Sequence, residues 1–83
     1  MSRIERKVFA TTPDGRVHVH MTTKLPTHAV ALLARYHAGP ATWHVTRWCG
    51  SCERAEHEAA TARVAPHYTI VQTAVLDVSE VGS

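Results

Sequence analysis

The stretch ATWHVTRWCGSCERAEHEAATARV, residues 41–64, decides the fold predicted for this 83-residue chain. Residues 42–47 are rich in β-branched and aromatic side chains, which predicts a strand. Residues 48–52 form a tight corner, and a helix is predicted from residue 52 to about residue 64. Ser51 is a candidate N-cap, three glutamates crowd the first half of the helix, and Arg63 lies in its last turn. This is the polarity that the helix dipole favours.

The buried stripe of the predicted helix consists of small side chains. It contains Cys52, Ala55, Ala59 and Ala62, which follow one another at helical spacing. Such a stripe lets a helix lie close against a sheet. We therefore expect Cys52 to be a small core residue and Cys49 to be a partly exposed thiol at the corner.

The N-terminal part predicts a hairpin. Residues 6–11 and 16–22 flank Pro13-Asp14-Gly15, in which proline presets φ and glycine accepts a positive φ. The second strand alternates strictly, so one of its faces should be buried and the other exposed to solvent. We expect the buried face to hold Val17, Val19 and Met21, and the exposed face Arg16, His18, His20 and Thr22.

The middle of the chain is ambiguous between helix and strand. Alanine and leucine in residues 27–38 favour a helix, with Thr27 as a possible cap. Against that, Gly39-Pro40 stands between two apolar runs of similar length, which is typical of a hairpin. We predict a strand here, with a helix as the alternative. The β-branched residues 68–78 predict a last strand, central in the sheet.

These elements predict a single α+β domain over residues 1–83, with an ordered core over about residues 6–78 and short frayed termini. The sheet is expected to be mostly antiparallel and five-stranded, in the order β-β-β-β-α-β, with the helix packed on one face.

Composition excludes some classes of protein. With 45% hydrophobic and 19% charged residues the chain is ordinary globular material. Because the chain contains no long apolar run, we predict that it has no signal peptide and no membrane span. We expect a cytoplasmic protein with free thiols. Residues 1–47 have a charge balance of +5 and residues 48–83 of −3.

Two motifs resemble a known group of proteins. THAV at residues 27–30 and WHVTRW at residues 43–48, followed by the small-residue helix, are similar to a loose group of short uncharacterised proteins of actinobacterial phages. The resemblance covers about residues 27–78. It implies a strand at residues 27–38, a final β-branched strand and a phage origin, but no activity. We expect the location to be the cytoplasm of the host cell. The CxxC segment is not part of the pattern.

Two candidate sites are suggested by basic and by metal-ligating residues. A basic strand face with aromatic neighbours could bind nucleic acid, and its members would be Arg16, His18, His20, Arg35 and Arg47. The CxxC corner resembles a thioredoxin site or, with a histidine, the opening of a zinc knuckle; its residues are Cys49, Cys52 and His57. Solvated strand histidines and structural cysteines are the commoner interpretations.

The sequence shows no combination of a nucleophile, a base and an orienting group. We therefore predict neither a catalytic site nor a cofactor. One short helix cannot cover a five-stranded sheet, and the apolar surface left over indicates an interface. We expect a small non-enzymatic interaction protein that forms a homodimer or binds a host protein through Trp43, Val71 and Val75, with nucleic-acid binding as the alternative.

Overall fold

The computed structural model describes residues 4–63 and 66–81. The elements in chain order are β1 (Arg6–Thr11), β2 (Val17–Thr22), β3 (His28–Tyr36), β4 (Ala41–Cys49), α1 (Cys52–Ala60), β5 (Tyr68–Asp77) and β6 (Ser79–Glu80). The α+β class and the antiparallel pairing are confirmed. Residues 28–36 form a strand, as the hairpin pattern predicts, and not the helix that propensity favours.

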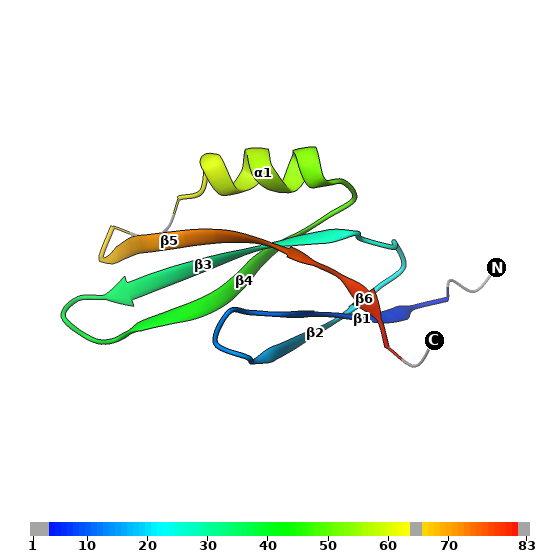
Figure 1. Ribbon diagram of the computed structural model, residues 1–83, viewed down its shortest axis with the longest axis horizontal. Coiled ribbons are helices and arrows are strands. Elements are labelled where there is room, and N and C mark those ends of the chain that lie inside the picture. The colour runs from blue at the N-terminus through cyan, green and yellow to red at the C-terminus, as the bar shows by residue number, and fades with distance from the viewer. Residues whose placement is uncertain (1–3, 64–65, 82–83) are drawn as a thin grey trace.

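The prediction of one five-stranded sheet is wrong in detail, because the strands form two three-stranded sheets, β4-β3-β5 and β2-β1-β6. β3, and not the last strand as predicted, is central in the large sheet, between β4 and β5; the first hairpin lies outside this sheet. It pairs instead with β6, which follows β5 after Val78 alone. The C-terminal strand therefore crosses from one sheet to the other, and Figure 1 shows α1, the large sheet and the small sheet as successive layers.

The core between α1 and the large sheet is built from small residues. Val30, Leu32, Cys49 and Ala55 are buried there, and Ala59, Ala62, Ile70 and Val75 pack against them. Ser51 caps the helix, since its side chain accepts a hydrogen bond from the Arg54 N–H at 3.2 Å. The helix ends at Ala60 with Thr61 as C-cap, earlier than predicted. Residue 64 lies outside the described residues.

The expected placement of the two cysteines is reversed. Cys49 is 6% exposed and belongs to the core, whereas Cys52 is exposed. Cys49 is still part of β4, where its side chain shares the helix-covered face with Val30. Cys52 is the first helical residue, and the sheet does not cover it. Ala55, one turn later, is the helix residue that is fully buried.

The first hairpin also buries the face opposite to the one expected. Val8 and Ala10 of β1 are 1% exposed, and they lie opposite His20 and His18 in the strand register. Directly opposed residues share a face, so the histidines point inward. The valines and the methionine of β2 point to solvent instead, with exposures of 60% for Val17, 55% for Val19 and 49% for Met21.

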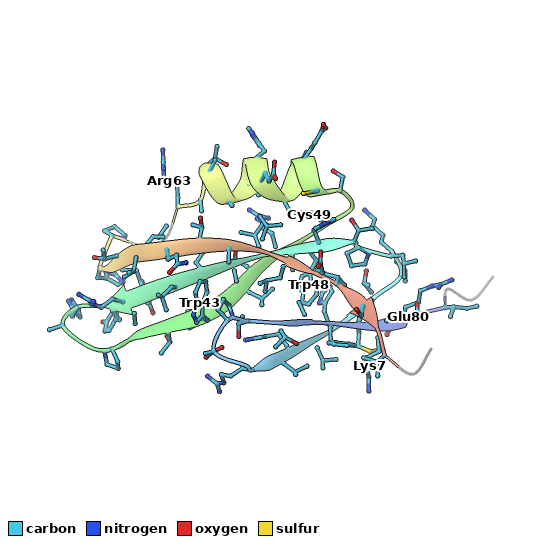
Figure 2. The ribbon with its side chains drawn as sticks, in the orientation of Figure 1. Lys7, Trp43, Trp48, Cys49, Arg63 and Glu80 are labelled. Carbon is cyan, nitrogen blue, oxygen red and sulfur yellow. The ribbon has the colours of Figure 1, made fainter. Side chains whose placement is uncertain are left out.

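Each inward histidine contacts another side chain. The His20 ring stacks on Trp48 of the large sheet, with centroids 4.9 Å apart and planes inclined by 10°. Trp48 lies between the two sheets in Figure 2. His18 Nε2 lies 3.2 Å from Thr12 Oγ1. The two sheets therefore meet through this ring pair and through Val8 and Ala10, and not through the predicted apolar stripe of β2.

Candidate functional site

The outward side of the small sheet is an apolar surface. We call it the outer face; its apolar members are Phe9, Val17, Val19, Met21 and Val81. The register places Phe9 opposite Val19 and Lys7 opposite Met21, and the Val81 N–H donates to the Lys7 carbonyl at 2.8 Å. Lys7 adds a positive charge at one end of this surface and points away from the large sheet in Figure 2. Exposed apolar side chains that gather on one face usually mark an interaction site.

The sequence contains a signal that could have identified this face. The loop of residues 12–16 fixes the register between β1 and β2, so that Val8 and Ala10 must lie opposite histidines. The small apolar residues Val8 and Ala10 therefore mark the histidine face of β2 as the inner face.

The predicted nucleic-acid residues do not form one basic strip. Arg16 lies in the hairpin turn, and His18 and His20 are half-buried between the sheets. Arg47 lies on the helix side of the large sheet, 3.8 Å from the Glu58 carboxylate. Arg35 is at the end of β3, on the face turned away from the helix. Stacking and phosphate contacts along a strand need residues on one surface, and this set is divided among several.

The thiol corner lacks the features that activate a cysteine. Burial raises the pKa of Cys49, and the Glu58 carboxylate raises it further. The Cys52 thiol donates a hydrogen bond to Glu56 at 3.5 Å, which, with nearby acidic charge, raises the pKa of Cys52 as well. Reactive cysteines have a lowered pKa in an electropositive setting. Within residues 4–63 and 66–81, Cys49, Cys52 and His57 do not gather with any other ligand into a metal-binding group.

We expect iodoacetamide to modify Cys52 slowly at pH 7.5 and Cys49 not at all in the folded protein. The raised pKa leaves Cys52 with a smaller thiolate fraction than a free cysteine has. Glu56→Gln should speed the reaction, because it removes the charge nearest to the thiol, whereas Glu53→Gln should change the rate less. Timed mass spectrometry of the alkylated protein measures this. Equal rates for the two variants would contradict the assignment to Glu56.

The three predicted interface residues lie in different places. Val75 packs under the helix against the core, and Trp43 is half-buried on the opposite face of the same sheet. Val71 is 50% exposed, at the irregularity where the pairing of β3 with β5 skips one residue. These three side chains do not share one surface, in contrast to the outer face.

A hydroxyl, an imidazole and a carboxylate meet at the first turn. Thr12 Oγ1 contacts the Asp14 carboxylate and lies 3.2 Å from His18 Nε2. In a nucleophilic triad the carboxylate orients the imidazole, but here it contacts the hydroxyl. Thr12 is also buried. The hydroxyl of Thr12 further donates to the Arg16 carbonyl at 3.2 Å, so the cluster closes the turn around Gly15, whose φ is 86°.

A polar cleft of about 360 Å³ separates the C-terminal half of α1 from β4. Arg47, Glu58 and Arg63 line it, and Figure 2 shows Arg63 at the end of the helix. Glu58 is already held by Arg54 at 3.1 Å and by Arg47 at 3.8 Å. The negative charge of Glu58 is therefore compensated within the protein by these two arginines.

Comparison of the chain with protein-family models, with curated protein sequences and with solved structures gives no match. Among the described residues, no helix has both the length and the apolar character needed to cross a membrane. The surfaces described above are thus the basis for assigning a function.

Proposed function

We propose that this protein is a small non-enzymatic accessory protein that acts by protein–protein association, and that its outer face pairs with the outer face of a second copy. The observation that carries the proposal is the exposure of Val17, Val19 and Met21, which alternate along β2 with side chains that face the core. A strand that turns its apolar side to solvent and its histidines inward is unusual for an isolated small sheet.

A second copy is the occupant that we propose, because the interface of a twofold dimer brings the same patch of both subunits together. The centre of the outer face is apolar, and Lys7 is the charged side chain that the β1–β2 register places on it. Face-to-face packing of two sheets needs such an apolar centre. Like charges at the rim remain solvated and are screened by salt.

The folded monomer would also become more stable if it buried more apolar surface. Its buried core is built mainly of alanine and valine, and a chain of this length buries only about 60% of its unfolded surface. Each half-exposed valine or methionine on the outer face would contribute about 1 kcal/mol when covered. After the cost of association, we expect a dissociation constant between about 1 µM and 1 mM.

We expect Val19→Glu to abolish dimer formation, because it places a carboxylate at the centre of the outer face. Sedimentation velocity over protein concentrations from micromolar to millimolar measures the monomer–dimer distribution. The matched control is Val71→Glu, at a side chain of similar exposure on the other sheet. If Val71→Glu weakened dimerisation and Val19→Glu did not, the interface would lie on the large sheet. A monomer throughout this range would refute the dimer.

A further inference from the structure

Four aromatic rings gather at one end of the large sheet, far from the outer face. They belong to Tyr36 and His37, where β3 ends, and to His67 and Tyr68, where β5 begins. Tyr36 and Tyr68 are directly opposed in the strand register, and their ring centroids are 5.0 Å apart. All four side chains are exposed to solvent.

The backbone fixes the two histidines beside each other. The His37 N–H donates to the His67 carbonyl at 3.3 Å, and the Gly39 N–H closes the turn onto the Tyr36 carbonyl at 3.0 Å. Within the part of the chain that the structure describes, His37 is the one non-glycine residue with a positive φ, 52°. Histidine is one of the few non-glycine residues that are enriched in this left-handed conformation, so the turn positions His37 without requiring strain.

The geometry of the imidazoles suits a shared ligand. Their centroids lie 6.1 Å apart, with the ring planes inclined by 27°. Since Zn–N bonds are about 2.0–2.1 Å long, two imidazoles that bind one tetrahedral ion have centroids about 5 Å apart, which is about 1 Å less than the distance between these rings. Both side chains are exposed, so rotation about their side-chain bonds can close this difference and direct a nitrogen of each ring at one ion. Tyr36 packs edge-on against both rings, with centroids 4.2 Å from His37 and 5.5 Å from His67.

We propose that His37 and His67 form a surface site for a divalent transition-metal ion of the class that imidazole prefers, namely Zn²⁺, Cu²⁺ or Ni²⁺. No third histidine, cysteine or acidic residue joins them within residues 4–63 and 66–81, so water completes the coordination sphere. Tyr36 packs against both rings and forms one wall of the site. This site is separate from the CxxC corner, which supplies none of its ligands.

The test is calorimetric titration with Zn²⁺ of the full chain carrying Cys52→Ser, which removes the exposed thiol as a competing ligand. We expect His37→Asn and His67→Asn each to weaken zinc binding at least tenfold. Asparagine is among the residues that best tolerate the positive φ of His37, so this variant should keep its fold. Melting curves recorded in EDTA check that it does. In addition, saturating Zn²⁺ should raise the melting temperature of the parent and not that of the double variant.

The matched control is the pair His44→Asn and His57→Asn, which removes the same number of exposed imidazoles from positions that do not face each other. We expect this pair to change the affinity less than twofold. Zinc binding that survives in the His37→Asn, His67→Asn double variant would overturn the proposal. An equally large loss of zinc binding in the His44→Asn, His57→Asn control would also overturn the proposal, since binding would then depend on scattered histidines.

Discussion

Replacing Ala55 by glutamine is expected to lower the free energy of unfolding by about 3 kcal/mol or more. Ala55 has no exposed surface and lies between α1 and the large sheet, against Val30, Leu32 and Cys49. A glutamine there overpacks the helix–sheet contact and buries an amide without a partner. Since a domain of this size is stable by only about 4–12 kcal/mol, a large part of its stability would be lost.

Urea denaturation followed by circular dichroism measures the effect. The matched control is Ala60→Gln, which makes the same change at an exposed position of the same helix and should shift the midpoint little. Equal midpoints for the two variants would show that the small-residue face of the helix is not its packing face.

Replacing Val8 by asparagine is the second change for which we expect a large effect, a loss of about 3 kcal/mol of stability. Val8 is 1% exposed and is among the largest fully buried side chains. It lies on the inner side of the small sheet, opposite His20, so the variant would bury an amide between the two sheets. Val19→Asn makes the same change on the outer face and should cost less than about 1 kcal/mol.

This pair of variants tests which side of the hairpin is buried. Both are compared by thermal unfolding at low protein concentration, so that weakened dimerisation of the Val19 variant does not enter the result. A larger loss for Val19→Asn than for Val8→Asn would mean that the hairpin buries Val17, Val19 and Met21 after all.

The two proposed surfaces lie in different parts of the molecule. The outer face belongs to the small sheet, and the histidine pair lies at the end of the large sheet beyond the first hairpin (Figure 1). Dimerisation would therefore leave His37 and His67 accessible, and zinc binding would leave Val19 free to pack. Failure of either experiment does not affect the other proposal.

Several local features could be predicted from the sequence because they depend on neighbouring residues. Ser51 caps the helix with its hydroxyl, Gly15 takes the positive φ of the first turn, and residues 28–36 form a strand because the Gly39-Pro40 segment lies between two runs that pair with each other. Capping, turn chemistry and hairpin layout are short-range, so the residue types that they require stand close together in the sequence.

The predicted sites could be located only in part. Both thiols could be named from the sequence, but their burial could not. Cys49 belongs to β4 and is buried in the core, whereas Cys52 begins the helix and is exposed. The predicted strip has Arg35 and Arg47 as neighbours, whereas the register turns them to opposite faces of the large sheet. One residue of β4, between Arg47 and Val45, is skipped in the pairing with β3, and this changes which side chains share a face. Strand alternation alone does not reveal such an irregularity.

What only the tertiary structure decided is which face of each strand is covered. Alternation along β2 divides its side chains into two sets, but either set can be the inner one. The choice was made by β1, whose small apolar pair faces the large sheet, and by Trp48, whose ring receives His20. In the same way, the sequence determined that five main strands and one helix exist. Their division into two sheets followed from long-range pairing, because β6 at the end of the chain pairs with β1 and not with the large sheet.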